Sequence, residues 1–445
     1  MTTEPQSRFI FSGHTWNPEK RMASFSYNIS YKGEAFDFTE TLTFPTDRGL
    51  SDVPEALFNT ILDNLSLVLG ISYYKLFLPK EIILENIVLN KEQAEFWNTV
   101  YTKGLGEFFY QNQLDFRGLI SFPVSTYGSK PLAFPRQNRS LVGIGGGKDS
   151  IVTGELLKQQ KKSFTSFVVN QHLIRDEVIS LLGGESLVVR RELDPLLFTL
   201  NKRNDTYNGH IPVSAQYAFI GVLLGALYDY RFVIVSNEQS SNYGNVEYHG
   251  IEINHQWSKS FEFEQLFQNY VRTFITPDIT YFSFLRPLTE LAIAKEFVNY
   301  PQYFTHFSSC NRNFRIDGSG NMKRWCGECA KCAFAFVMLA AFLSKEDILT
   351  IFGEDFFAKE TLLRIYQELL GVVNIKPFDC VGTPDEVIVA FYLASKKGKY
   401  QDTRAMQFFE QDVLSKVADI DALQQHVFAQ SSEHAIPEEF LGINK

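Results

Sequence analysis

The chain has 445 residues, with 42 Lys and Arg against 51 Asp and Glu, and a formal net charge of -9. Its 45% hydrophobic and 21% charged residues are typical of a globular protein and exclude a disordered one. An acidic chain is a poor binder of duplex phosphates, so we expect no nucleic-acid partner. The apolar stretches at 213–227 and 333–343 are too short to span a bilayer, or carry a Gln, and residues 1–9 show no apolar signal core. We therefore expect no membrane association and a cytoplasmic location.

The first 135 residues are predicted to form an N-terminal α+β unit. Phe25, Tyr27 and Ile29 alternate with polar residues, and the same period of two continues in residues 36–44, which predicts a β-meander. From Pro54 the apolar residues recur at helical spacing until Gly70. A second helix is predicted over residues 91–110.

From residue 136 to 343 the chain alternates between short apolar strands and helices. Such alternation predicts right-handed crossovers and an α/β fold with a doubly wound parallel sheet. Residues 344–445 are predicted to form a helical C-terminal region with helices at 346–352, 358–370 and 385–394. The strands of the central region are predicted at 140–144, 164–170, 186–190 and 232–236, and its helices at 150–160, 176–182 and 213–228. Ligands bind at the carboxyl ends of strands in such sheets, so we expect the site just after these strands.

A glycine loop follows the first of these strands and opens a helix. Its residues are Gly145, Gly146, Gly147, Lys148, Asp149 and Ser150. Glycines let backbone N–H groups approach an anion, and a helix N-terminus favours phosphate. A Rossmann loop would need glycine in place of Lys148, and a Walker A loop would need Ser or Thr in place of Asp149.

The loop resembles the S-G-G-x-D-S loop of the PP-loop ATP pyrophosphatases, with Gly145 at the usual serine position. The resemblance implies a PP-loop domain over residues 136–343, with the loop glycines, Lys148 and Ser150 on the pyrophosphate of ATP and Asp149 near Mg²⁺. We add Asn170 to this nucleotide-binding set because it is the last residue of the next predicted strand, at its carboxyl end.

Four of the five cysteines are clustered, at Cys310, Cys326, Cys329 and Cys332. In a reducing compartment such a cluster indicates metal binding or catalysis before disulfides. Four thiolates suit tetrahedral Zn²⁺, although an iron–sulfur cluster uses the same ligands. The pattern resembles that of the 7-cyano-7-deazaguanine synthases, a branch of the PP-loop family, which implies a structural zinc.

Longer motifs narrow the resemblance to one family. They include G-I-G-G-G-K-D-S, N-G-H-I-P-V, S-N-E-x-S-x-x-Y-G, N-H-Q-W-S-K and W-C-G-E-C-A-K-C, and the likeness covers most of the chain. Together they resemble the UDP-N-acetyl-α-D-muramoyl-L-alanyl-L-glutamate epimerases of certain bacteria. The resemblance implies an ATP- and Mg²⁺-dependent isomerase of peptidoglycan synthesis. It would invert the terminal L-Glu of the UDP-MurNAc dipeptide through an acyl-adenylate and release AMP and pyrophosphate. A ligase that adds L-glutamate would supply its substrate.

Inversion at a carbon needs proton transfer on both of its faces, through two side chains or through one that moves. The catalytic candidates lie in the polar clusters of the sequence: His210, Glu238, His255 and Lys259. Histidine has a suitable pKa without perturbation, whereas Lys259 is better suited to stabilising an oxyanion. Cys380 is an alternative thiol base. Arg286 and Arg312 are candidates for binding the acidic groups of the substrate.

Two other functions stay open at this level. One is a PP-loop enzyme that forms an amide or nitrile on an adenylated carboxylate. The other is a nucleotide-binding or RNA-associated regulator that kept the fold without catalysis. The net charge and the lack of a Lys/Arg stripe disfavour RNA. The presence of Lys148, Asp149 and Ser150 argues against an inactive loop.

Overall fold

One nine-stranded sheet runs through the molecule, in a computed structural model that describes residues 7–314, 323–373 and 375–442. The strand order is β11-β8-β5-β6-β7-β3-β2-β1-β4. The strands are β1 (Arg8–Asn17), β2 (Met22–Tyr31), β3 (Glu34–Thr43), β4 (Glu81–Leu84), β5 (Ser140–Gly143), β6 (Phe164–Val169), β7 (Glu185–Glu192), β8 (Phe232–Val235) and β11 (Thr280–Ser283). A separate two-stranded ribbon is formed by β9 (Val246–Tyr248) and β10 (Ile251–Ile253).

The central strands β11, β8, β5, β6 and β7 are all parallel, which confirms the predicted α/β class with a mostly parallel sheet. The chain moves from β5 outward to β6 and β7, and then returns to place β8 and β11 on the other side of β5. This reversal between β5 and β8 creates a crevice at their carboxyl ends, where α/β sheets bind ligands.

The N-terminal meander extends the same sheet. Strand β2 pairs antiparallel with β1 and β3, and β3 pairs antiparallel with β7 through Thr41–Thr43 and Arg190–Glu192. At this junction the Arg191 Nε lies 2.6 Å from the Glu40 carboxylate, and both side chains are buried. The Arg191 guanidinium also donates to Gln216 of a covering helix, so one buried cation joins the two halves of the sheet.

Apolar residues on successive positions of each central strand point to opposite faces of the sheet, and each face has its own core. Leu141 and Val233 belong to one core, while Val142 and Ile234 belong to the other. The first core contains residues of α1 (Glu55–Tyr74), α2 (Lys91–Gly104), α3 (Gly106–Gln111), α6 (Pro195–Leu200), α7 (Val213–Tyr228) and α8 (Phe261–Phe274). The second contains residues of α4 (Lys148–Gln159), α5 (Leu173–Leu182), α9 (Glu290–Phe297) and α10 (Ala330–Ala340).

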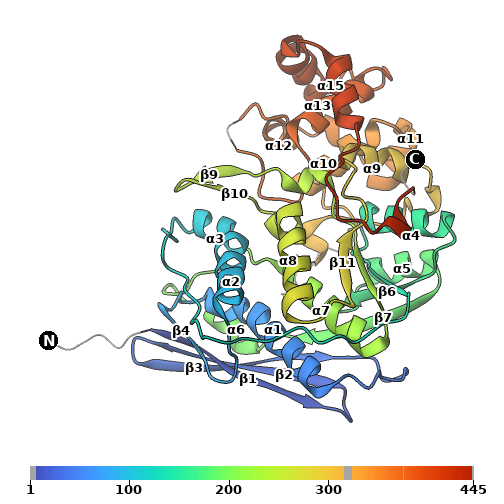
Figure 1. The fold of residues 1–445 in the computed structure, drawn as a ribbon. Coiled ribbons are helices and arrows are strands. Elements are labelled where there is room, and N and C mark those ends of the chain that lie inside the picture. The colour runs from blue at the N-terminus through green and yellow to red at the C-terminus, as the bar shows by residue number, and fades with distance from the viewer. Residues whose placement is uncertain (1–6, 315–322, 374, 443–445) are drawn as a thin grey trace.

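The C-terminal region is helical, as predicted, and lies at the end of the molecule opposite the meander (Figure 1). The expected helix at 358–370 is split into short 3₁₀ turns followed by a shorter α-helix. The helices are α11 (Lys345–Phe352), α12 (Leu363–Leu369), α13 (Pro384–Ser395), α14 (Arg404–Phe408) and α15 (Ile420–Phe428).

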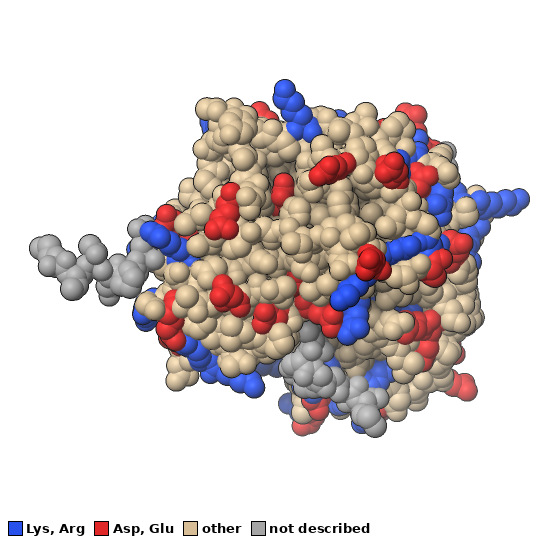
Figure 2. Space-filling model, turned by 90° about the horizontal axis from the view of Figure 1, so that it is seen from below, with Lys and Arg blue, Asp and Glu red and all other residues tan. Residues whose placement is uncertain are grey.

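Among the described residues, α1 is the one helix with the length and apolar composition of a membrane span, and 72% of its most apolar window is buried inside the protein. It packs on β1, β2 and α7, which accounts for its apolar character as a core helix. On the face shown in Figure 2, acidic and basic residues are interspersed and no large patch of one charge is visible.

Candidate active site

The glycine loop connects β5 to α4 at the crevice of the sheet. Gly147 is the N-cap of α4, so the free N–H groups of the helix N-terminus face the loop. Gly146 has a φ of +85°, and a Cβ there would lie 3.1 Å from the Ile174 side chain. A Cβ at Gly145 would meet no atom within 4 Å. The loop therefore requires glycine at position 146 and leaves open space at position 145.

Lys148 is buried beneath the loop between two carboxylates, those of Asp149 and Glu290. Burial alone would lower the pKa of Lys148, but the two carboxylates, Asp149 and Glu290, raise the pKa by more than burial lowers it. The side chain therefore stays charged. Burial raises the pKa of Asp149, but the charges of Lys148 and Lys331 lower it by more, so Asp149 is ionised. This combination of a helix N-terminus, a cation and an ionised carboxylate can bind a phosphate together with a divalent metal.

A cavity of about 300 Å³ lies between the glycine loop and the segments that follow β8 and β10. Gly145, Gly147, Asp149 and Ser150 line it on the side of the loop. From other parts of the chain it is lined by Glu238, Lys259, Lys331 and Cys380. The structure thus brings the predicted phosphate loop into one cavity with two of the four predicted catalytic residues, Glu238 and Lys259.

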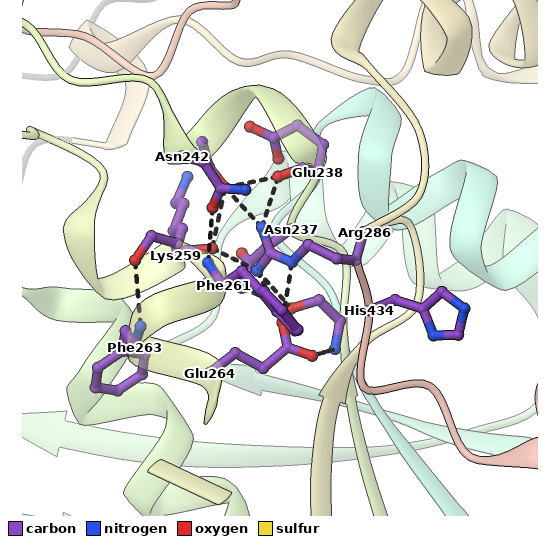
Figure 3. Close-up of polar contacts among 12 residues, drawn as sticks. Asn237, Glu238, Asn242, Lys259, Phe261, Phe263, Glu264, Arg286 and His434 are labelled. Atoms are coloured by element: carbon purple, nitrogen blue, oxygen red, sulfur yellow. Dashed lines mark hydrogen bonds and ion pairs between the residues drawn. The ribbon is translucent and has the colours of Figure 1, made fainter. Parts of the chain in front are cut away.

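Arg286 holds the two segments that contain Glu238 and Lys259. Its guanidinium donates to the backbone oxygen of Glu238 at 2.6 Å and to that of Lys259 at 2.6 Å. It also pairs with the Glu264 carboxylate at 2.8 Å, and its own side chain is fully buried. Figure 3 shows the Arg286 guanidinium reaching between the segments of Glu238 and Lys259.

His210 and His255 lie side by side behind the cavity, with ring centroids 4.3 Å apart. Both face Glu107 of α3: its carboxylate is 2.5 Å from His255 Nδ1 and 3.6 Å from His210 Nδ1. His255 also hydrogen-bonds to Cys380, and Lys259 Nζ donates to Cys380 Sγ at 3.1 Å. Cys380 therefore connects the histidine pair to the cavity.

The two histidines have opposite pKa shifts. Burial lowers the pKa of His210 well below its ordinary value, and the nearby charge of His255 adds to this effect. Burial also lowers the pKa of His255, but its hydrogen bonds to Cys380 and Glu107 outweigh burial and raise the value to about 9. His210 is therefore neutral near pH 7, whereas His255 is protonated.

The ionisable groups that line the cavity also differ in charge. Burial raises the pKa of the Cys380 thiol, but Lys259 and His255 lower it by more, so the thiolate is favoured. Burial, followed by the charge of Asp149, raises the pKa of the Glu238 carboxyl above its ordinary value. For Lys259, burial lowers the pKa, but Cys380 and Glu238 raise it by more. The cavity thus contains a thiolate, an ammonium and a carboxyl group with an increased tendency to retain its proton.

The four clustered cysteines surround one point. The Sγ atoms of Cys310 and Cys329 are 4.0 Å apart, those of Cys326 and Cys332 are 3.6 Å apart, and all four lie within 4.8 Å of one another. Tetrahedral Zn²⁺ with Zn–S bonds of about 2.3 Å would place its sulfurs about 3.8 Å apart. All five cysteines of the chain are free thiols, so the sulfur positions suit a zinc ion and not disulfides.

This cysteine cluster lies directly beside the glycine loop. Ser308, two residues before Cys310, donates its backbone N–H to the Gly146 oxygen at 3.1 Å. Ser308 and Ser309 line the cavity, as does Lys331, which adjoins Cys332. A metal at the cysteines would therefore stabilise one wall of the cavity.

Comparison with known proteins gives the same family along almost the whole chain. A family model described as the MurL N-terminal domain matches residues 1–284, and one described as the MurL C-terminal domain matches residues 306–424. The UDP-N-acetyl-alpha-D-muramoyl-L-alanyl-L-glutamate epimerase of Xanthomonas oryzae pv. oryzae is 37% identical over 390 residues, covering 84% of this chain and 83% of that protein. The protein of that name from Micromonospora sp. is 36% identical over 433 residues, 96% of each chain. A third, from Salinispora tropica, is 35% identical over 406 residues, 88% of this chain and 86% of the relative.

The chain belongs to the MurL epimerase family. Arg286, Arg312 and Asn170, which were predicted to bind substrate or nucleotide, lie away from the cavity lining, as do the two histidines. Arg286 is enclosed by protein partners behind the cavity, and Arg312 pairs with Glu328 at 2.6 Å, where both side chains are partly exposed. Asn170 has a φ of +62°, and its side-chain amide makes two hydrogen bonds to the backbone of Arg191 on β7.

Three residues that were not selected from the sequence make contact with groups of this candidate site. Glu107 contacts both histidines, Glu290 contacts Lys148, and Lys331 approaches the Cys380 carbonyl. Each belongs to a short motif: G-L-G-E-F, R-P-L-T-E or C-A-K-C. No spacing along the chain relates Glu107 to a histidine more than 100 residues away.

Proposed function

We propose that this protein is an ATP- and Mg²⁺-dependent epimerase of peptidoglycan synthesis that inverts the terminal L-Glu of UDP-MurNAc-L-Ala-L-Glu to D-Glu. The names of its curated relatives support the substrate and the reaction class. The single observation that carries the proposal is the shared cavity, where the glycine loop faces Glu238, Lys259 and Cys380.

The nucleotide would bind at the glycine loop in the manner of PP-loop enzymes. Free N–H groups at the start of α4 and the charge of Lys148 suit the phosphates of ATP. The open space at Gly145 leaves room for a phosphate against the backbone. Asp149 lines the cavity as an ionised carboxylate and would be a ligand for Mg²⁺, which would neutralise phosphate charge.

Activation of the glutamate carboxylate explains why an epimerase would use ATP. Removing the α-proton beside a carboxylate would build a second negative charge on the same group, and stabilising such charge is usually the largest part of catalysis. Transfer of AMP to the carboxylate would remove its charge and release pyrophosphate. The α-proton of the resulting acyl-adenylate is then acidic enough for a side-chain base, and hydrolysis after inversion returns the acid and AMP.

Proton transfer would use the ionisable groups that converge on the cavity. The positive charge of Lys259 would stabilise the enolate oxygen that forms when the α-proton leaves. Glu238, whose raised pKa favours the protonated carboxyl, would return a proton to the α-carbon. His255 and His210, one step behind Cys380, would adjust the protonation of the site together with Glu107.

The four cysteines would hold a structural Zn²⁺. All four positions of a tetrahedral ion are then occupied by protein sulfurs, which leaves no position for substrate. We therefore give the metal no role in the reaction and assign it to the wall of the cavity that contains Ser308 and Ser309.

The test is incubation of the purified protein with ATP, Mg²⁺ and UDP-MurNAc-L-Ala-L-Glu, followed by acid hydrolysis and chiral separation of glutamate. We expect D-Glu together with AMP and pyrophosphate, and no D-Glu when ATP is omitted. AMP and pyrophosphate with an amide product in the presence of ammonia would indicate a different PP-loop reaction. ATP binding without AMP formation would indicate a regulator.

A further inference from the structure

We infer that Cys380 is the residue that removes the α-proton on one face of the substrate, and that His255 and Glu107 form its proton relay to the surface. This inference rests on the proposed function, because it assigns a step of the same epimerisation. It concerns a thiol that the family likeness does not assign and that lies outside the four-cysteine cluster.

The position of Cys380 in the cavity suits a residue that removes a proton from the substrate. Cys380 lines the same cavity as Asp149 and Ser150 of the glycine loop, so its thiol and a nucleotide-activated carboxylate would share one space. It lies in an irregular segment just before α13, and its backbone oxygen accepts from Lys331 Nζ. The side chain is partly exposed, as a group that touches substrate must be.

Two basic side chains lie beside the thiol of Cys380. Lys259 Nζ lies 3.1 Å from Cys380 Sγ, and His255 hydrogen-bonds to the same sulfur. Both neighbours are cationic, and cations beside a cysteine favour the thiolate, the form that accepts a proton. The lowered pKa of Cys380 agrees with this arrangement.

The remaining candidates are less suited to remove the proton. Lys259 lines the cavity but stays protonated, because Cys380 and Glu238 raise its pKa. The raised pKa of Glu238 favours its protonated carboxyl, so we place it as the group that returns a proton to the carbon. His255 and His210 do not line the cavity, so they reach the substrate only through Cys380.

The relay follows from a row of contacts. His255 bonds Cys380 on one side, and its Nδ1 lies 2.5 Å from the Glu107 carboxylate on the other. The side chain of Glu107 is 13% exposed and that of the adjacent His210 is 25% exposed, so the row leads from the cavity toward solvent. A proton taken by the thiol can leave along this row without crossing the substrate.

The proposed step transfers the α-proton of the substrate to the Cys380 thiolate. The Cα–H bond of the activated glutamate breaks and an S–H bond forms on Cys380, while the electron pair moves into the enolate of the acyl group. The Glu238 carboxyl then gives its proton to the opposite face of the carbon. Loss of the thiol proton through His255 and Glu107, and uptake of one by Glu238, restore the starting state.

The experiment compares the wild-type protein with Cys380→Ala and Cys380→Ser in D₂O, using ATP, Mg²⁺ and the UDP-MurNAc-L-Ala-L-Glu substrate. Adenylation is followed by hydroxylamine trapping of the activated carboxylate, and proton transfer by deuterium at the glutamate α-carbon. We expect both variants to form the adenylate and to lose α-deuteration and D-Glu by about 10²–10⁴-fold, the range for loss of a general base. Circular dichroism and zinc content check that the variants are folded.

Three outcomes would overturn the inference while leaving the proposed function intact. The first is α-deuteration at the wild-type rate in Cys380→Ala. The second is loss of adenylation in a folded variant, which would make Cys380 a binding residue. The third is a substrate adduct on Cys380 by intact mass, which would make it a nucleophile. If the wild-type protein forms neither adenylate nor D-Glu, the proposed function itself fails.

Discussion

Arg286 and Glu264 form an ion pair of 2.8 Å in which neither side chain reaches solvent. The same guanidinium donates to the backbone of Glu238 and Lys259. The pair therefore links the end of β8 to the segment before α8 and sets the position of two residues in the cavity. The attraction within a buried ion pair offsets the free energy of desolvation only when the remaining hydrogen bonds of both groups are satisfied. The main role of this pair is therefore to position the two segments.

Replacing Arg286 should strongly destabilise the folded protein. Arg286→Met leaves the Glu264 carboxylate buried and unpaired, so we expect the free energy of unfolding to fall by about 3–5 kcal/mol in urea titrations. The double variant Arg286→Met/Glu264→Gln should lose less stability than Arg286→Met alone, because no unpaired carboxylate remains buried. Arg272→Met, on the exposed side of α8, is the control and should change stability by less than about 0.5 kcal/mol. Equal losses in the single and double variants would contradict this view of the pair.

The two neighbouring loop glycines should respond differently to substitution. Gly146→Ala forces a side chain into a φ of +85° against Ile174, so it should lower stability by about 1–2 kcal/mol and weaken ATP binding. Gly145→Ser should leave stability unchanged, because a Cβ there meets nothing within 4 Å. Thermal unfolding with and without ATP measures both effects. Equal destabilisation by the two variants would show that the loop conformation differs from the one described.

Lys148 should be needed for the nucleotide step. Lys148→Met removes the buried cation between Asp149 and Glu290, so we expect a fall of at least about 10²-fold in substrate-dependent pyrophosphate release. Lys161→Met, an exposed position just after α4, is the matched control and should release pyrophosphate at the wild-type rate. Normal release by Lys148→Met would exclude the loop as the phosphate site.

Removal of the proposed zinc should lower the stability of the fold and should not act directly on the reaction. Cys326→Ala deletes one of four converging thiols, so the metal content should drop well below one zinc per chain by mass spectrometry and the melting temperature should fall. Cys380→Ala serves as the matched control, since its thiol lies outside the cluster, and it should keep its metal. Iron with sulfide in the wild-type protein would identify a cluster in place of zinc.

The activity should have an alkaline limit set by His255. Its pKa is raised to about 9 by Cys380 and Glu107 against the effect of burial, so the imidazolium that supports the thiolate is lost as pH rises through about 9. Protonated His255 also stabilises the folded state, because its pKa is higher in the folded than in the unfolded chain. This contribution is fully present below pH 6.5 and is lost as the pH rises through about 9. The charged or titratable groups around His255 are Glu107, His210, Asp379 and Cys380.

Glu107→Gln tests the origin of this limit. The variant removes one carboxylate that supports the protonated form of His255, so the alkaline limb of kcat/KM should move down by about one pH unit or more. Glu177→Gln, which faces the separate His306 at the surface, is the control and should leave the limb in place. An unchanged profile in Glu107→Gln would exclude His255 as the group behind the limb.

The periodicity of apolar residues predicted the helices and strands that are determined by residues close together in the sequence. The alternation in residues 25–44 predicted the meander, and short apolar runs predicted β5, β6, β7 and β8. The strand β11 was not predicted, although β5 and β8 have the same length of four residues. The long helix expected over 91–110 divides at Leu105 into α2 and α3, which no local signal marked.

The sequence by itself determined the chemical groups: the glycine loop at the start of a helix, the four-thiol spacing, and the polar segments after β8 and β10. Only the tertiary structure decided which of them meet. Glu107 and His255 are 148 residues apart in sequence, and Lys259 and Cys380 are 121 apart, yet each pair is in contact. Sheet order and core packing set such contacts. They determined that Arg286 is enclosed in the protein and that Cys380 faces the cavity, because long-range packing, unlike local periodicity, leaves no regular spacing along the chain.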